Sequence, residues 1–182
     1  MNLIIYTIGH STREFDKFIE ILNKYEITQL IDVRTVPKSR HVPQFNHDTL
    51  EQDLPRQNIS YTHIEKLGGL RNTNKTSINQ GWHNKSFRGY ADYMQTDEFQ
   101  EGLEQLESLA REKTTTVMCA EAVPWRCHRS MIGDALLVRD WQVVDIFDER
   151  KTQNEKLTSF AQVKNKNITY PNVEELKDKE SI

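Results

Sequence analysis

The chain has 182 residues, 24 basic and 27 acidic side chains, a formal net charge of −3 and two cysteines. This balance does not favour wholesale binding to nucleic acid or a membrane surface, and two cysteines do not make the disulfide framework of a small secreted domain. No apolar stretch approaches the ~20 residues that span a bilayer, and the apolar residues 1–6 lack the features of a signal peptide, so we expect one cytoplasmic domain.

In chain order, five short apolar or β-branched runs alternate with amphipathic patterns of helical period. Ser11 and Glu14 match the capping box of a first helix that begins near Phe15, and we expect Pro55 to end the second helix early. The expected strands are 3–8, 29–34, 59–64, 114–120 and 142–147. The expected helices after the first are 47–56, 87–94, 97–113 and 127–139.

This alternation predicts an α/β fold, a single three-layer domain with a mostly parallel sheet of about five strands flanked by helices. We assign the α/β domain to residues 1–147 and treat 148–182 as a polar C-terminal extension, either a surface appendage or a partly ordered tail. Residues 65–86 lack periodicity and predict a long loop, of a kind that is often functional or mobile. Because parallel strands end at one edge of the sheet, the polar residues that follow them should meet there.

The segment 117–129 predicts the end of a buried strand, a proline-containing loop and the first turn of a helix. It concentrates two thiols, a carboxylate, an imidazole and two guanidinium groups: Cys119, Cys127, Glu121, His128, Arg126 and Arg129. Cys127 lies near the start of the helix, which lowers a thiol pKa and favours a nucleophile. Cys119 shares a strand face with Glu121 and is either a nucleophile or a buried apolar filler.

Two other predicted strands end in polar residues. His10 and Ser11 lie where a helix amino terminus attracts a phosphate or carboxylate, and the alternative for Ser11 is a plain helix cap. Asp32 and Arg34 share one strand face, so a structural ion pair between them is as well supported as a catalytic role.

Weaker signals lie in the middle of the chain. Gly68 and Gly69 would let the backbone approach a ligand, although a turn explains them as well. Arg88 could reach an anion and Tyr90 could stack on a base, although both also suit packing. The sequence contains neither a dinucleotide-binding fingerprint nor a phosphate-binding loop, so the cofactor stays unknown.

Taken together, these motifs resemble a bacterial and archaeal family known as domain of unknown function 488. The resemblance covers about residues 3–147. It rests on residues 7–11, 32–34 with Pro37 and Ser39, 67–69, 89–94, and 118–121 with 127–129. The resemblance implies that the polar motifs belong to one family pattern, and it implies no particular reaction.

Our leading hypothesis is a small enzyme, a hydrolase or a transferase of unspecified reaction, acting on a phosphate-bearing compound such as a nucleotide or nucleic-acid end. Guanidinium groups suit phosphate, so the anion-binding candidates are Arg34, Arg88, Arg126 and Arg129. His10 or His128 would transfer protons, Glu121 or Asp32 would orient the histidine or act as the base, and Cys119 or Cys127 would be the nucleophile. We expect alanine at Glu121 or Arg129 to abolish activity and leave the fold intact.

Two alternatives stay open. The same edge could belong to a non-catalytic nucleic-acid or nucleotide-binding module, although such a module gains nothing from the carboxylate of Glu121. The protein could also be a thiol redox or zinc protein, in which the two cysteines and His128 bind a metal with His10 or Asp32. The spacing of the cysteines matches no tight zinc knuckle, so no metal is assigned.

The sequence leaves the oligomeric state open and indicates no membrane partner.

Overall fold

The structure, a computed structural model, describes residues 2–180 and confirms a single α/β domain built on a mostly parallel sheet. The strand order is β3-β2-β4-β1-β5-β6, and all neighbours are parallel except the last pair. The strands are β1 (Ile4–Gly9), β2 (Gln29–Asp32), β3 (Ser60–His63), β4 (Thr115–Cys119), β5 (Gln142–Ile146) and β6 (Thr152–Asn154).

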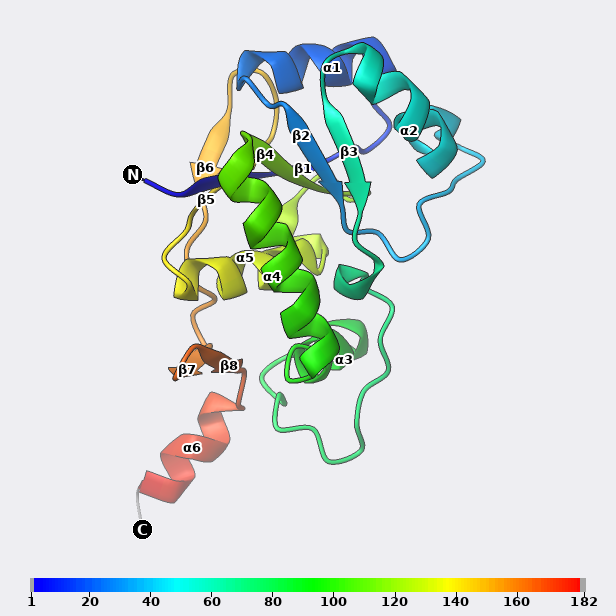
Figure 1. Cartoon of the computed structure of the whole chain (residues 1–182). Coiled ribbons are helices and arrows are strands. Elements are labelled where there is room, and N and C mark those ends of the chain that lie inside the picture. The colour runs from blue at the N-terminus through cyan, green and yellow to red at the C-terminus, as the bar shows by residue number, and fades with distance from the viewer. Residues whose placement is uncertain (1, 181–182) are drawn as a thin grey trace.

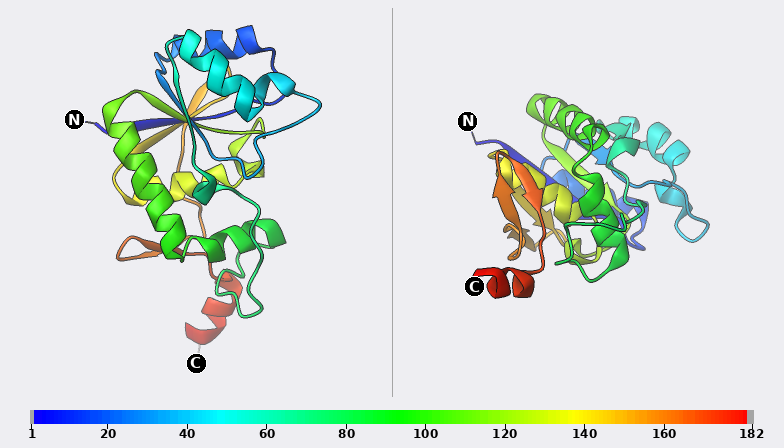
Figure 2. Two further views of the ribbon diagram at one scale, coloured as in Figure 1. Left: turned by 45° about the vertical axis from the view of Figure 1, so that its right-hand side comes forward. Right: turned by 90° about the horizontal axis from the view of Figure 1, so that it is seen from below.

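Helices cover both faces of the sheet, as Figures 1 and 2 show. Helices α1 and α2 lie on one face, and α3, α4 and α5 lie on the other. The helices of these two layers are α1 (Phe15–Lys24), α2 (His47–Arg56), α3 (Lys85–Tyr93), α4 (Asp97–Glu112) and α5 (Arg129–Val138). Successive strand residues point to opposite faces. Leu30 and Met118 therefore pack into the core beneath α1 and α2, whereas Ile31 and Val117 pack into the core beneath α3, α4 and α5.

Several local expectations need correction. The expected capping box does not form: Glu14 occupies the cap position of α1 without a side-chain hydrogen bond, and Ser11 adopts a positive φ of 52°. Pro55 does not end α2 early, because the helix continues through Arg56. The helix expected from residue 127 begins at Arg129, after a short 3-10 turn, η3 (Pro124–Arg126).

The polar C-terminal extension contributes to the fold. It supplies β6, a sixth strand that pairs with β5, and a hairpin of β7 (Gln162–Lys164) and β8 (Asn167–Thr169), followed by α6 (Val173–Glu180). Ile168 and Tyr170 are buried in the core. The Tyr170 hydroxyl donates to Asp134 Oδ2 over 2.8 Å. Among residues 2–180, no helix is both long and apolar enough to cross a membrane.

Candidate functional site

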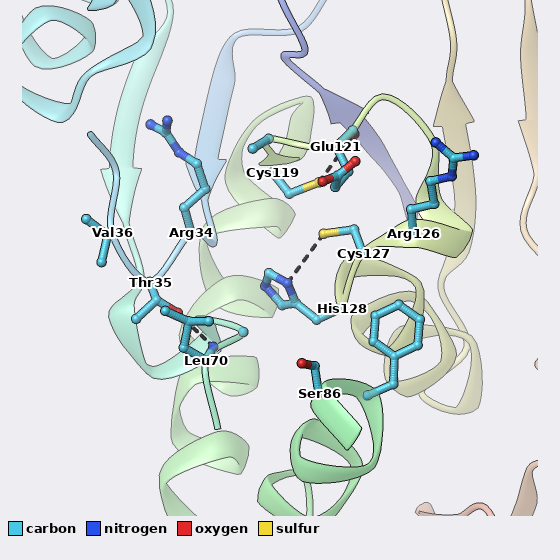
Figure 3. Close-up of a pocket in the computed structure, with 13 residues that line it drawn as sticks. Arg34, Thr35, Val36, Leu70, Ser86, Cys119, Glu121, Arg126, Cys127 and His128 are labelled. Carbon is cyan, nitrogen blue, oxygen red and sulfur yellow. Dashed lines mark hydrogen bonds between the residues drawn. The ribbon is translucent and has the colours of Figure 1, made fainter. Parts of the chain in front are cut away.

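A cavity of about 280 Å³ opens beyond the carboxyl ends of β2 and β4 (Figure 3), where ligands bind in open parallel sheets. The loop between β4 and α5 forms one wall, and residues after β2 and η2 (Glu65–Leu67) form another. The lining includes Arg34, Val36, Gly69, Leu70, Ser86, Phe87, Cys119, Glu121, Arg126, Cys127 and His128. The parallel sheet thus brings Arg34 to the same cavity as the residues of the segment 117–129.

Cys119 is the last residue of β4, and its side chain is 1% exposed. Its Sγ accepts a hydrogen bond from Arg129 Nε over 3.1 Å. Burial alone would raise the pKa of this thiol, but the interaction with Cys127 and the charge of Arg129 outweigh burial and lower the pKa. The pKa of Cys119 is therefore lowered despite its burial.

Arg129 is buried at the start of α5, and its guanidinium group is engaged by the protein itself. Nη1 donates to Thr7 Oγ1 over 2.6 Å, and Nη2 donates to the carbonyl oxygens of Glu121 and Ala122 over 3.2 and 3.3 Å. Asp145 lies 4.0 Å from Nη1 and provides the opposite charge. Arg129 is thus placed to hold the β4–α5 loop and to polarise Cys119, rather than to receive a substrate anion.

Cys127 and His128 form a thiol–imidazole contact at the cavity. His128 Nε2 donates to the carbonyl oxygen of Val33 over 2.9 Å, so its Nδ1, 3.3 Å from Cys127 Sγ, is the acceptor. Burial lowers the pKa of His128 to about 4, so the ring is neutral near pH 7. The interaction with Cys119 and burial raise the pKa of Cys127. A Cβ at Gly69 would lie 2.5 Å from His128 Nδ1, so glycine permits this close approach.

His10, Asp32 and Arg34 form a network in which Arg34 alone lines the cavity. Arg34 Nε and Nη2 donate to the two carboxylate oxygens of Asp32 over 2.9 and 2.7 Å. Arg34 Nη1 lies 3.2 Å from His10 Nε2, and the His10 ring stacks on Phe45. Burial lowers the pKa of His10 to about 4. The structural ion pair between Asp32 and Arg34 is therefore present, and neither Asp32 nor His10 lines the cavity.

Glu121 and Arg126 are the exposed charged residues of the cavity wall. Both come from the β4–α5 loop, and Figure 3 shows Glu121 next to Cys119. Within residues 2–180, the guanidinium group of Arg126 has no hydrogen-bond or ion-pair partner, in contrast to Arg34 and Arg129. Arg126 is therefore the guanidinium group of this wall that is available to an incoming anion.

Other residues proposed from the sequence lie outside the cavity. Arg88 Nε donates to the Trp82 carbonyl oxygen over 3.0 Å. Tyr90 is wholly buried, and its hydroxyl donates to the Leu67 carbonyl oxygen over 2.9 Å. Ser11 and Gly68 also do not line the cavity.

The sequence analysis missed the apolar part of the wall, which includes Val36, Leu70 and Phe87. Val36 and Leu70 are respectively 63% and 74% exposed. An isolated apolar residue in a loop carries no sequence signal for a ligand site, since single exposed apolar residues are ordinary.

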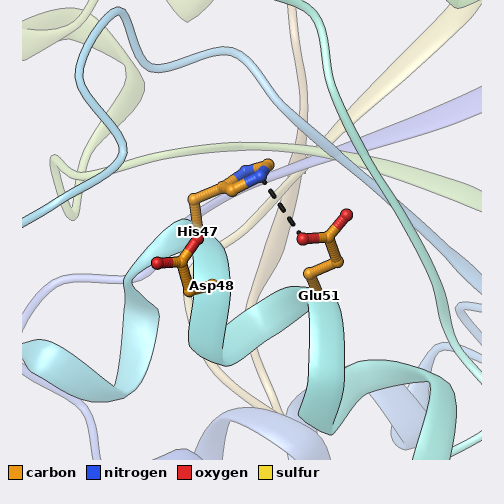
Figure 4. A group of neighbouring side chains, drawn as sticks. All are labelled: His47, Asp48 and Glu51. Atoms are coloured by element: carbon orange, nitrogen blue, oxygen red, sulfur yellow. Dashed lines mark ion pairs between the residues drawn. The ribbon is translucent and has the colours of Figure 1, made fainter.

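Potential metal ligands gather elsewhere in the described part of the chain. His47, Asp48 and Glu51 on α2 (Figure 4) each offer one ligand atom, and these atoms lie within 4.8 Å of one another. Asp48 and Glu51 are exposed, and His47 Nε2 forms an ion-pair contact with Glu51 at 3.6 Å. Cys119, Cys127 and His128 are not part of such a group with His10 or Asp32.

The fold and this cavity define a class: a three-layer α/β domain with a cavity at the carboxyl ends of its parallel strands, lined by Cys119 at the end of β4 and by Cys127 in the loop that follows. Residues 14–136 match the model of the family described as domain of unknown function DUF488, and the chain belongs to that family. The match includes the whole β4–α5 loop. It begins after the Gly9-His10-Ser11 motif and does not include it. No curated protein and no solved structure matches the chain.

Proposed function

We propose that this protein is a cysteine-dependent enzyme, a hydrolase or transferase, that acts on a small phosphate-bearing compound with Cys119 as its nucleophile. The observation that carries the proposal is the 3.1 Å hydrogen bond from Arg129 Nε to Cys119 Sγ, which favours the thiolate at the wall of an open cavity. An inert buried cysteine needs no such donor.

Arg126 supports the phosphate-bearing class of substrate. It is exposed on the cavity wall, and guanidinium groups bind phosphate oxygens in a planar, two-pronged geometry. Val36, Leu70 and Phe87 would contact an apolar or aromatic part of the same substrate, such as a nucleobase. Neither Arg34 nor Arg129 is needed for this contact.

In the proposed reaction, the Cys119 thiolate attacks the phosphorus atom, a sulfur–phosphorus bond forms, and the bond to the leaving group breaks. Water or a second hydroxyl compound then attacks the phosphorus, and the sulfur–phosphorus bond breaks to regenerate the thiolate. Glu121 is exposed on the same wall, where its carboxylate can accept the proton of the attacking hydroxyl group.

The test combines Cys119→Ser and Arg126→Gln with Arg56→Gln as a matched control, because Arg56 is an exposed arginine on α2, away from the cavity. The probes are inorganic phosphate, nucleoside monophosphates, 4-nitrophenyl phosphate and 5′-phosphorylated oligonucleotides. We expect Cys119→Ser to abolish turnover and retain binding. Arg126→Gln should weaken binding of the phosphate compound, and Arg56→Gln should change neither.

Full activity of Cys119→Ser would contradict the proposal. Binding of oligonucleotides without any turnover, unchanged in Cys119→Ser, would instead indicate a nucleic-acid-binding module.

A further inference from the structure

Cys127 has no bond-making role in the reaction proposed above, yet it is a buried thiol facing the nucleophile. Figure 3 shows the sulfur atoms of Cys119 and Cys127 pointing toward one another across the cavity wall, one from the end of β4 and the other from just before α5. Both cysteines are free thiols, and the interaction between them lowers the pKa of Cys119 and raises that of Cys127. Seven residues of loop separate the two positions in the sequence.

We propose that Cys119 and Cys127 act together as a dithiol that reduces small hydroperoxides and closes into a reversible intramolecular disulfide. The inference shares the nucleophile of the proposed function but adds a second activity, which needs no phosphate compound.

The neighbouring groups give the two thiols different roles. Arg129 Nε donates to the sulfur of Cys119, which favours its thiolate and makes it the first nucleophile. Cys127 Sγ lies 3.3 Å from the acceptor atom Nδ1 of the neutral His128 ring. His128 can therefore take the Cys127 proton at the moment when Cys127 becomes the second nucleophile.

The chemistry balances without a further reactant. The Cys119 thiolate attacks one oxygen of the hydroperoxide, a sulfur–oxygen bond forms, the oxygen–oxygen bond breaks, and the alcohol leaves after taking up a proton. The sulfur of Cys127 then attacks the sulfenic acid on Cys119, the disulfide bond forms, and water leaves with the proton that passed through His128. Each hydroperoxide is thus reduced to alcohol and water while two thiols are oxidised. An external dithiol returns the pair to its starting state.

The shape of the site favours a hydroperoxide over a bulky disulfide as the oxidant. Cys119 is 1% exposed and Cys127 is 6% exposed, so only a small molecule that enters the cavity can reach either sulfur. The apolar side chains of Val36, Leu70 and Phe87 would accept the alkyl group of an organic hydroperoxide.

The test treats the reduced full-length protein with one equivalent of hydrogen peroxide or tert-butyl hydroperoxide. The protein is then digested with trypsin without reduction and analysed by mass spectrometry. Trypsin cleaves after Lys113, Arg126 and Arg129, so it separates the two cysteines into different peptides. We expect peptides 114–126 and 127–129 to stay joined until dithiothreitol is added, with loss of both free thiols.

Two single variants serve as controls for one another. In Cys127→Ser the reaction should stop at a sulfenic acid on Cys119 that dimedone traps and that excess peroxide converts irreversibly to sulfinic acid. In Cys119→Ser, Cys127 should stay a thiol at the same peroxide dose.

If wild type gains oxygen on Cys119 but yields no joined peptides, the dithiol inference is overturned while Cys119 remains the reactive nucleophile of the proposed function. If neither cysteine reacts faster than free glutathione, the inference and the activated nucleophile both fail.

Discussion

Arg129 Nε donates a hydrogen bond to Cys119 Sγ across 3.1 Å, and this bond joins the first residue of α5 to the last residue of β4. The same guanidinium group reaches Thr7 on β1 and two carbonyl oxygens of the intervening loop. One buried cation therefore contacts both the β4–α5 loop and the thiol beside it.

Replacement of Arg129 by alanine should destabilise the protein by about 3–5 kcal/mol, because it removes the buried positive charge beside Asp145 and leaves two loop carbonyls without their buried donor. This revises the expectation from sequence that the variant keeps its fold intact. Urea denaturation measures the loss. The exposed Arg126→Ala should lie within about 0.5 kcal/mol of wild type, and equal stability of the two variants would contradict the assigned role of Arg129.

The alkylation of Cys119 should depend on Cys127. The interaction with Cys127 helps to lower the pKa of Cys119, so Cys127→Ala should raise that pKa and move the alkylation midpoint to higher pH. The measurement is the rate of iodoacetamide modification of Cys119 across pH, followed by peptide mass spectrometry. Cys119→Ser shows the background rate. A midpoint that does not move would show that Cys127 does not stabilise the thiolate.

Gly9 should tolerate no larger residue, because a Cβ at this position would overlap the carbonyl oxygen of Glu121. We expect Gly9→Ala to cost about 1–3 kcal/mol and to displace the β4–α5 loop, which would slow alkylation of Cys119. Gly102→Ala on α4 is the matched control, since its Cβ meets side chains of Lys66 and Leu67 no closer than 3.0 Å. A wild-type alkylation rate in Gly9→Ala would contradict this coupling.

Glu155→Gln should stabilise the protein at neutral pH. Burial and the charges of Asp145 and Asp134 raise the pKa of Glu155 from 4.5 to about 9, and its Oε2 is buried without a hydrogen-bond partner. Between these two pKa values the unfolded chain is ionised while the folded chain holds the proton, so this group makes the free energy of unfolding fall as pH rises.

Removing the ionisable group should therefore raise the free energy of unfolding by up to about 3 kcal/mol at pH 7. The gain should shrink as pH falls toward 4.5, where both states are protonated. Urea denaturation at several pH values checks this, with the exposed Glu51→Gln as control. A gain that does not change with pH would show that Glu155 is ionised in the folded protein.

Most of the fold could be predicted from hydrophobic patterns. The runs at β2 and β4 are short, apolar and β-branched because both faces of a central strand are buried. Strand β6 escaped prediction, because its three exposed residues, Thr152–Asn154, pair at the sheet edge and have no apolar periodicity. Tyr170 is buried by contacts that local sequence does not reveal.

The sequence by itself determined that chemically active residues gather at one edge, because parallel strands separated by helices all end on the same side. It could not decide which arginine side chain binds other residues of the protein and which is exposed to solvent. Arg34 is paired with Asp32 and Arg129 with Cys119, while Arg126 stays exposed. Only the tertiary structure decided this, since hydrogen bonds act over about 3 Å and depend on positions set by packing, not by sequence spacing.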